Sequence, residues 1–308
     1  MAGLQPSLLG AEMIPSVTGY LQDSGYVPKG HDCNVNIFLG RNSFLHFFLP
    51  GGKSLAVKVA DVGSDSAKAL ENEACALQKL YAIYNGLIPK FIMLGRNEDF
   101  TFLVMEGLTV SGATIDDVMS LSGSQRLTMQ HLLGGEDRRI DRDINSSDNP
   151  VRILARAIEI LPEGLQHKYK KIMKDREWEA FLLTMPAIPQ HGDLAINNVG
   201  KTERGIIIFD WEDYGIIDIP GFDLCIMLCS SCDFKKDKLL AIIDGIYQDA
   251  ENSDHFLAPI VAGLHAGQAR FINLIMIHLI LFHDIKCKLN YGEGVIGNIR
   301  RLLDELTN

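Results

Sequence analysis

Three polar side chains within one short stretch are of the types that phosphoryl transfer requires. Asp193 is followed five residues later by Asn198, and Asp210 comes directly after the apolar run 206–209. A carboxylate can accept the proton of an attacking hydroxyl, whereas an amide oxygen and a second carboxylate are hard ligands that Mg²⁺ prefers. The pattern therefore predicts a proton acceptor at Asp193 and metal ligands at Asn198 and Asp210.

The sequence between these residues indicates how they come together. Residues 206–209 are apolar and rich in β-branched side chains, preceded by Gly205 and followed by Asp210, which is typical of a short buried strand. Asp193 and Asn198 lie in a loop and short turn before it, so a hairpin-like return would gather all three. A turn that is merely rich in Asp and Asn is the alternative for either half alone. The two halves at this separation favour the site.

The same residues resemble a known superfamily. His-Gly-Asp-Leu-Ala-Ile-Asn-Asn-Val at 191–199, followed by Ile-Ile-Phe-Asp-Trp-Glu-Asp at 207–213, resembles the aminoglycoside phosphotransferase and choline kinase superfamily. The resemblance implies an α+β, protein-kinase-like fold of two lobes, with an antiparallel β-sheet and one main helix in the N-lobe and a mostly α-helical C-lobe. Many protein kinases carry, in place of Gly192, an Arg that pairs with a phosphorylated activation loop. Gly192 therefore favours a small-molecule kinase.

The resemblance also gives expectations for neighbouring residues. His191 is expected to pack and hydrogen-bond so that it holds the loop, without acting as the base. Asp223, in the segment Gly-Phe-Asp-Leu that follows, is expected to bond back to the catalytic loop. Glu212 and Asp213 would face the metal or a cationic substrate, and simple surface exposure is an equal alternative for both.

An antiparallel meander is predicted in the N-terminal third. Three strand-like runs cover 35–39, 43–49 and 54–59, with turn signals between them. In the superfamily the first turn covers the nucleotide phosphates, a role that would fall to Gly40 and Ser43. Because the sequence has no G-x-G-x-x-G motif here, a plain hairpin is the equal alternative.

A lysine–glutamate pair is expected next. Lys58 lies in an alternating apolar strand, where a lysine commonly faces solvent. The helix predicted over 66–81 carries an apolar stripe and resembles the superfamily helix whose Glu pairs with the strand lysine. We assign Glu73 to that role, with Glu71 as the alternative. Such a pair would hold the ammonium against the nucleotide's α and β phosphates.

The adenine-binding segment is predicted from resemblance alone. Strand candidates cover 90–94 and 100–105, and the sequence that ends the second resembles the segment between the lobes. The backbones of Glu106 and Leu108 would then bond the purine edge, with Met105 at the back of the pocket. An ordinary strand that ends at Gly107 is the alternative.

The rest of the chain is predicted to be largely helical. Helices are expected over 114–121, with Thr114 as N-cap, over 150–160 and 164–184, and in four segments after residue 222. Residues 122–150 are polar and turn-rich, as in a solvated surface segment or a mobile insert. The predicted organisation is a loose N-terminal leader over 1–30 with a short helix near 16–24, an N-lobe over 31–106 and a C-lobe over 107–308.

Composition limits the classes of function. The 308 residues carry a formal net charge of −10, which argues against nucleic-acid binding and is compatible with a cationic substrate. The six cysteines show no disulfide framework, and Cys225 and Cys229 are expected to be buried structural thiols on one helix face. No signal peptide or membrane span is evident, so a cytoplasmic location is expected, and the oligomeric state is not readable.

The sequence thus predicts a kinase that uses ATP or GTP with Mg²⁺ to phosphorylate a hydroxyl of a small molecule. An aminoglycoside or amino sugar, an amino alcohol and a sugar intermediate would all suit as acceptors. A catalytically silent pseudokinase scaffold is one alternative, although the intact set Lys58, Asp193, Asn198 and Asp210 counts against it. A protein kinase is the other, disfavoured by Gly192 and by the lack of an Ala-Pro-Glu motif after Asp210.

Overall fold

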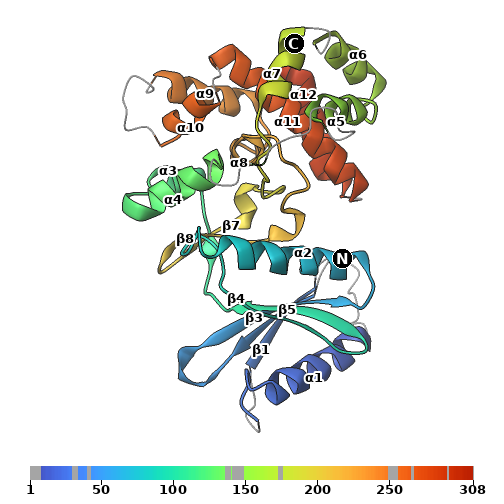
Figure 1. Ribbon diagram of the computed structural model, residues 1–308, viewed down its shortest axis with the longest axis vertical. Coiled ribbons are helices and arrows are strands. Elements are labelled where there is room, and N and C mark those ends of the chain that lie inside the picture. Colours follow the sequence, from blue (N-terminus) through green and yellow to red (C-terminus); the bar gives the residue numbers. More distant parts are fainter. Residues whose placement is uncertain are drawn as a thin grey trace. The chain divides into compact units, whose positions relative to one another are not determined.

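The computed structural model describes residues 8–29, 34–39, 43–135, 140, 149–172, 176–248, 256–264, 267–289 and 291–307. The chain forms two compact units, Met1–Val110 (unit 1) and Ser111–Asn308 (unit 2). Figure 1 shows the helices and strands of both units. Unit 1 is built on one sheet, whereas unit 2 is mostly helical.

The sheet of unit 1 has five antiparallel strands in the order β1-β2-β3-β5-β4. The strands are β1 (Asn34–Leu39), β2 (Ser43–Phe48), β3 (Ser54–Asp61), β4 (Phe91–Arg96) and β5 (Phe100–Glu106). The predicted meander of the first three strands is confirmed by the pairing of Leu39 with Ser43 and of Phe48 with Ser54. The two central strands, β3 and β5, are buried along nearly their whole length because helices cover both faces of the sheet.

The predicted loose leader is wrong. Residues 8–23 form the helix α1 (Leu8–Asp23), and its side chains Met13, Val17 and Leu21 are part of the same hydrophobic core as Val57 and Phe102 of the sheet. The expected short helix over 16–24 is only the second half of α1. A proline at position 15 and weak periodicity hid the first half, and burial against the sheet outweighs the local cost of that proline.

The opposite face of the sheet is covered by α2 (Asp65–Leu80), which packs on β3, β4 and β5. Its first turn is capped by Ser64, whose hydroxyl accepts a hydrogen bond from the Ala67 N–H at 3.1 Å. Leu70, Ala74 and Leu77 form its buried stripe, which confirms the predicted amphipathic helix. Strand alternation explains why Val57 faces α1 while Lys58 faces α2.

Unit 2 begins with a small sheet and continues as a helical body. The sheet pairs β6 (Ser111–Gly112), β7 (Val199–Thr202) and β8 (Gly205–Ile208) in that order. The helices are α3 (Ile115–Met119), α4 (Gly123–Gly134), α5 (Pro150–Ile158), α6 (Glu163–Ile172), α7 (Arg176–Thr184), α8 (Phe222–Ser231), α9 (Lys236–Gln248), α10 (Ala258–Gly263), α11 (Gln268–Lys288) and α12 (Glu293–Leu306).

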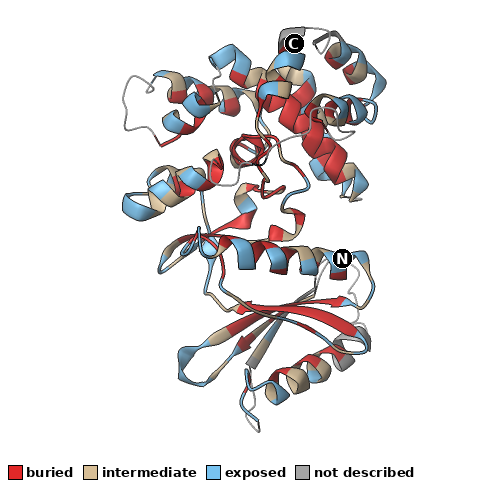
Figure 2. Ribbon diagram, in the orientation of Figure 1, coloured by how far each residue is buried: buried red, intermediate tan, exposed pale blue. Residues whose placement is uncertain are grey.

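The centre of unit 2 is the long helix α11. It packs against α5, α8 and α12, and Figure 2 shows it and α8 as buried along most of their length. Cys225 and Cys229 are fully buried on α8, as predicted, and burial raises the pKa of both thiols. The predicted N-cap of α3 is confirmed by a capping box that joins Thr114 and Asp117.

Several helix boundaries differ from prediction. Residues 164–184 form two helices, α6 and α7, and the predicted polar segment 122–150 begins with α4. The charged part of that segment, 136–143, lies outside the described residues apart from Ile140. The region after 222 holds α8 to α12 where four helices were expected.

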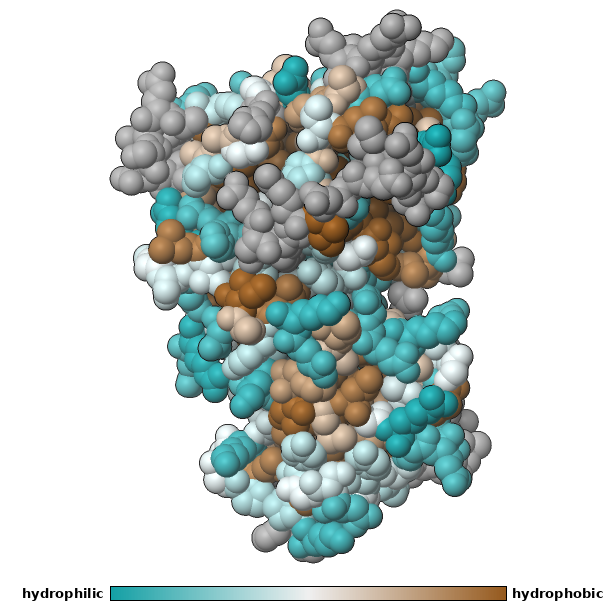
Figure 3. All heavy atoms as spheres, viewed as in Figure 1, coloured by the Kyte–Doolittle hydropathy of each residue, from teal (hydrophilic) through white to brown (hydrophobic). Residues whose placement is uncertain are grey.

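Large exposed apolar side chains, such as Leu127 and Ile216, are distributed over different elements, and the face in Figure 3 mixes polar and apolar residues. Over the described ranges, no helix has both the length and the apolar character needed to cross a bilayer.

Candidate active site

In unit 1 the chemistry centres on one buried ion pair. The Lys58 ammonium donates to both carboxylate oxygens of Glu73, at 2.9 and 2.7 Å. The side chains are 10% and 1% exposed. Adjacent strand and helix positions create this contact, because Lys58 points from β3 toward α2 while Glu73 lies on the buried face of α2. A bidentate pair in this environment fixes the position of the ammonium.

The remaining residues expected at the nucleotide lie along the end of β5 and the start of β2. Met105 is buried, and Glu106 is committed to Lys90, whose carbonyl accepts from the Glu106 N–H and whose N–H donates to the Glu106 carboxylate, both at 3.0 Å. Ser43 opens β2 and is partly exposed. Gly40 lies outside the described residues. The structure describes no hydrogen-bond partner for the N–H of Leu108.

In unit 2 the loop that carries Asp193 is held by a buried carboxylate. Asp223, fully buried at the start of α8, accepts hydrogen bonds from the N–H groups of His191 at 2.7 Å and Gly192 at 3.1 Å. Farther along, the Ile196 N–H donates to the hydroxyl of Ser230, also on α8, at 2.8 Å. The loop is thus fixed at two points on one helix.

His191 connects the loop to the end of β8. Its Nδ1 accepts from the Asp193 N–H at 3.3 Å, so the proton is on Nε2, which donates to the Phe209 carbonyl at 2.8 Å. The ring also packs on Trp211, with 4.5 Å between centroids. With both ring nitrogens committed to backbone groups, His191 orients the loop and has no lone pair left for use as a base.

Asn198, one of the two expected metal ligands, lies in the short 3₁₀ turn Ile196–Asn198. Its amide nitrogen donates to the Asp193 carbonyl at 2.8 Å, which leaves the amide oxygen for other partners. The Asn197 amide donates to that oxygen at 3.1 Å. The Phe209 N–H donates to the Asn198 carbonyl at 2.9 Å, and this bond ties the turn to the segment that ends in Asp210.

Asp210 has a left-handed backbone, with φ 59° and ψ 58°. That conformation is costly for residues other than glycine and is concentrated at functional sites. Asn198 and Asp210 supply two hard oxygen donors, and no group of three His, Cys, Asp or Glu side chains suited to a metal occurs among the described residues. This donor set fits Mg²⁺, which takes one or two protein ligands and completes its shell with phosphate oxygens and water.

The environment of Asp193 holds a residue that the sequence did not identify. Burial raises the pKa of the Asp193 carboxyl, while the Lys286 ammonium of α11, 2.8 Å from Oδ2, opposes that rise. Lys286 is 1% exposed. A lysine near a helix C-terminus usually interacts with the helix dipole, so the position of Lys286 does not by itself indicate a contact with Asp193. The available signal was its position on the apolar stripe of Ile275, Leu279 and Phe282.

The two acidic residues after Asp210 differ in burial. Asp213 is buried and Glu212 is partly exposed, in the 3₁₀ turn Trp211–Asp213. The Asp213 carbonyl lies so close to Gly192 that a Cβ on Gly192 would be 2.6 Å from it, and Gly192 has φ +89°. The turn and the catalytic loop are therefore packed backbone against backbone, and surface exposure is wrong as an account of Asp213.

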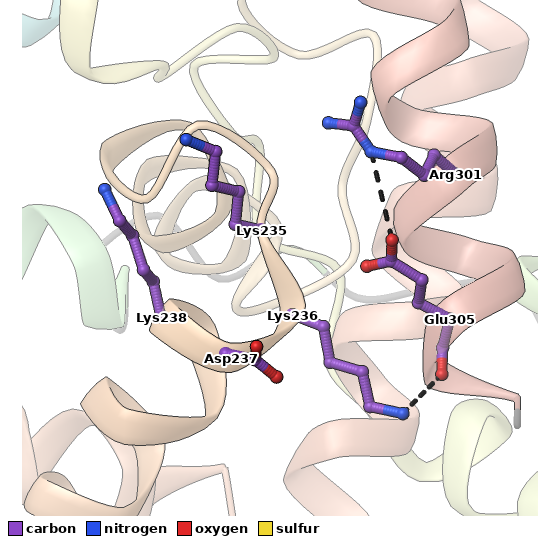
Figure 4. A pocket seen from close by; sticks show the side chains of 6 residues that line it. All are labelled: Lys235, Lys236, Asp237, Lys238, Arg301 and Glu305. Carbon is purple, nitrogen blue, oxygen red and sulfur yellow. Dashed lines mark hydrogen bonds and ion pairs between the residues drawn. The ribbon is translucent and has the colours of Figure 1, made fainter.

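A separate pocket of unit 2, of about 630 Å³, lies between α9 and α12 (Figure 4). Lys236 donates to the Glu305 carbonyl at 2.6 Å, and Arg301 pairs with the Glu305 carboxylate at 4.0 Å. None of the residues predicted for catalysis lines this pocket. Its lining consists of Lys235, Lys236, Asp237, Lys238, Arg301 and Glu305.

Comparison with known proteins gives no match to a family model and none to a curated protein. Solved structures do match across nearly the whole chain. Choline kinase LicA from Streptococcus pneumoniae is 14% identical, with a TM-score of 0.58 over 96% of this chain and 98% of the other. Macrolide 2'-phosphotransferase type I is 13% identical, with a TM-score of 0.57 over 98% and 99%.

A third structure, the putative fructosamine-3-kinase from Haemophilus somnus 129PT, is 14% identical, with a TM-score of 0.53 over 98% of this chain and 100% of the other. At these identities the likeness is one of fold. The predicted fold class is confirmed by these matches together with the antiparallel sheet of unit 1 and the helical unit 2. The chain therefore has a protein-kinase-like fold, similar to that of the solved choline kinase and macrolide phosphotransferase structures.

Proposed function

We propose that the protein is an ATP-dependent kinase that transfers the γ-phosphate to a hydroxyl of a small molecule. The observation that carries the proposal is the loop of unit 2, in which Asp223 and His191 hold the backbone N–H groups of residues 191 to 193. A fixed carboxylate next to hard oxygen donors is the arrangement that phosphoryl transfer requires, because catalysis there depends on positioning and electrostatics.

Each residue has a definite role in this proposal. Asp193 orients the acceptor hydroxyl and takes its proton as the new P–O bond forms and the bond to the leaving ADP breaks. Lys58, held by Glu73, neutralises charge on the nucleotide phosphates. Asn198 and Asp210 would hold Mg²⁺, which would offset the charge of the phosphate oxygens.

The nucleotide proposal has separate support. The related structure of LicA was solved in complex with AMP. In this chain the end of β5 would contact the adenine through the Glu106 carbonyl and the Leu108 N–H, with Met105 behind it. Ser43 and Gly40 would lie over the phosphates. GTP would satisfy the phosphate contacts equally, so a direct comparison of the two nucleotides belongs in the first assay.

A pseudokinase scaffold is the second candidate. The observation that favours it is the absence of a G-x-G-x-x-G motif before β2. The buried Lys58–Glu73 pair and the constrained Asp210 backbone argue for catalysis. A protein that only binds nucleotide also has no need of a fixed proton acceptor such as Asp193. The solved proteins of similar fold are described as kinases and phosphotransferases, which also supports a catalytic role.

The test is ATP turnover with Mg²⁺ against a panel of amino sugars, amino alcohols, neutral polyols and peptides. Wild type is compared with Asp193→Asn, which keeps the side-chain shape, and with Lys170→Met, an exposed lysine of α6, as control. Acceptor-stimulated turnover that disappears in Asp193→Asn and persists in the control supports the kinase. Nucleotide binding with no stimulation by any acceptor would favour the scaffold, and failure to bind nucleotide would overturn the proposal.

A further inference from the structure

Lys286 is a charged residue in an apolar position. It lies in the last turn of α11, where Ile275, Leu279 and Phe282 form the same buried stripe, and its side chain is 1% exposed. Its ammonium pairs with the Asp193 carboxylate at 2.8 Å, and Tyr291 is its other side-chain hydrogen-bond partner. A buried charge is expensive, so its retention needs a reason.

Two aromatic rings enclose the ammonium. Nζ of Lys286 lies 3.9 Å from the centroid of the Tyr291 ring and 4.9 Å from that of Phe282. Cations bind the faces of aromatic rings at these distances, and this is how proteins recognise ammonium ligands. Lys286 therefore fills, from within the chain, a place beside Asp193 that would otherwise suit the ammonium of a ligand.

The carboxylate of Asp193 is only half engaged. Lys286 contacts Oδ2, whereas no described group bonds Oδ1, and the side chain is 16% exposed. An acceptor hydroxyl can therefore bond to Oδ1 while Oδ2 keeps its cation. The ammonium then remains within a few ångströms of the reacting hydroxyl throughout the reaction.

We propose that Lys286 sets the charge class of the acceptor, so that this chain phosphorylates hydroxyls with no cationic group beside them. The inference rests on the proposed function, because it takes Asp193 as the residue that receives the acceptor. It reverses the expectation of a cationic substrate that the acidic net charge allows. The acceptors that fit are neutral sugars, polyols and simple alcohols, whereas choline-like amino alcohols and vicinal amino sugars do not.

Three other titratable residues lie near the acceptor position. Asp210 and His191 interact electrostatically with Asp193, and Asp213 does so with Tyr291. In the proposed enzyme the charge of Asp210 is offset by the metal, and His191 is committed to the backbone. Lys286 is in direct contact with the reacting carboxylate. At about 6 Å and the effective dielectric of protein sites, its repulsion of a cationic acceptor is on the order of 100-fold, which cancels the attraction that the Asp193 carboxylate would otherwise exert on that cation.

The experiment uses acceptor pairs that differ in charge and little else. Choline is compared with 3,3-dimethylbutan-1-ol, its uncharged isostere, and glucosamine with glucose. kcat and KM are measured for the wild type, Lys286→Met and Lys286→Arg. Lys288→Met is the matched control, because it removes an exposed ammonium two residues farther along the same helix. Melting temperatures establish that each variant is folded.

For wild type we expect the ratio of kcat/KM for the neutral member to kcat/KM for the cationic member to be at least one, because the Lys286 ammonium cancels the attraction of Asp193 for a cation. Lys286→Met should reduce that ratio at least tenfold, chiefly by lowering KM for the cationic member, while Lys286→Arg and Lys288→Met keep it. A purely structural role would instead lower kcat for both members equally and leave the ratio unchanged. If Lys286→Met does not fold, Lys286→Gln, which removes the charge but keeps a polar side chain, takes its place in the same comparison with Lys286→Arg and Lys288→Met.

Calorimetric titration of the same pairs in the presence of a non-hydrolysable ATP analogue separates this inference from the proposed function. Binding that depends on acceptor charge and on Lys286, without turnover, would support the specificity and refute the kinase. Turnover in which choline or glucosamine is preferred by wild type would refute the specificity and leave the kinase standing. Binding of neither member of either pair would also overturn the inference.

Discussion

Each unit holds a buried lysine–carboxylate pair, and the two pairs use their carboxylates differently. In unit 1, Lys58 engages both oxygens of Glu73, which is 1% exposed. In unit 2, Lys286 engages one oxygen of Asp193, which is 16% exposed. The first carboxylate is fully used in placing a cation. The second keeps an oxygen for another partner, as the reactive role proposed for Asp193 requires.

The largest expected effect concerns Asp193, the carboxylate of the pair in unit 2. Asp193→Asn should lower acceptor-dependent turnover by about 1,000-fold, because proton acceptance by a positioned base is commonly worth 100- to 10,000-fold. Nucleotide affinity should change little, and steady-state kinetics with equilibrium nucleotide binding would show both. Equal losses of turnover and nucleotide affinity would mean that Asp193 serves the nucleotide, and the contrast with Glu73 would disappear.

The next effect concerns stability. Glu73→Gln leaves the Lys58 ammonium buried without its counterion, at a cost of about 3–5 kcal/mol in the free energy of unfolding. Lys286→Met should cost less, about 1–2 kcal/mol, because Asp193 is partly exposed and regains water. Urea unfolding of both variants gives the comparison. A larger loss for Lys286→Met would show that the second pair is mainly structural.

A drop in pH should lower the stability of unit 2 through His278, which lies on the same helix as Lys286. Burial lowers the pKa of His278 to about 3, and its Nε2–H donates to the Pro220 carbonyl at 3.1 Å. Because the folded pKa lies below the unfolded value, the unfolded state binds the proton first, and stability falls as the pH drops below about 6.5. By pH 5 this residue alone should cost about 2 kcal/mol.

Unfolding measured at pH 7.5 and pH 5 in wild type and His278→Gln tests this expectation. The variant should lose less stability on acidification. His283 also has a pKa lowered to about 4 by burial and by Arg300, so some acid sensitivity should remain in His278→Gln. An unchanged acid response would assign the effect to groups other than His278.

The smallest effect is expected at a surface pair. Lys168 of α6 lies 2.8 Å from Asp304 of α12, and both side chains are substantially exposed. Lys168→Met should change the free energy of unfolding by less than about 1 kcal/mol, because water already solvates both charges. A loss as large as that of Glu73→Gln would show that burial is not what separates strong pairs from weak ones in this chain.

The sequence was sufficient for residues whose partners are nearby or follow a repeated pattern. The strands β1 to β3, the amphipathic α2 and the capped α3 were all predicted from periodicity and turn residues. Their local preferences and tertiary contacts favour the same structure. The Lys58–Glu73 contact was expected from the resemblance of strand and helix to those of the superfamily, and the structure contains it.

Prediction failed where long-range packing decides the outcome. Helix α1 is stabilised by the packing of Met13, Val17 and Leu21 against the sheet, although its own sequence signals are weak. Lys286 meets Asp193 only through the packing of α11 in unit 2, and no local pattern encodes that contact. No strand was predicted over Val199–Thr202, the hairpin partner β7, because this segment is short and ends in polar residues.

The close approach of Gly192 to the Asp213 backbone constrains how this sequence can evolve. Any side chain there would meet the Asp213 carbonyl and would have to adopt a backbone conformation that glycine alone tolerates well. A single codon change to arginine, which would begin to recreate the phosphate-sensing position of protein kinases, should therefore damage the loop before it could confer any control. The packing of Gly192 therefore disfavours the stepwise evolution of phosphorylation control at this position.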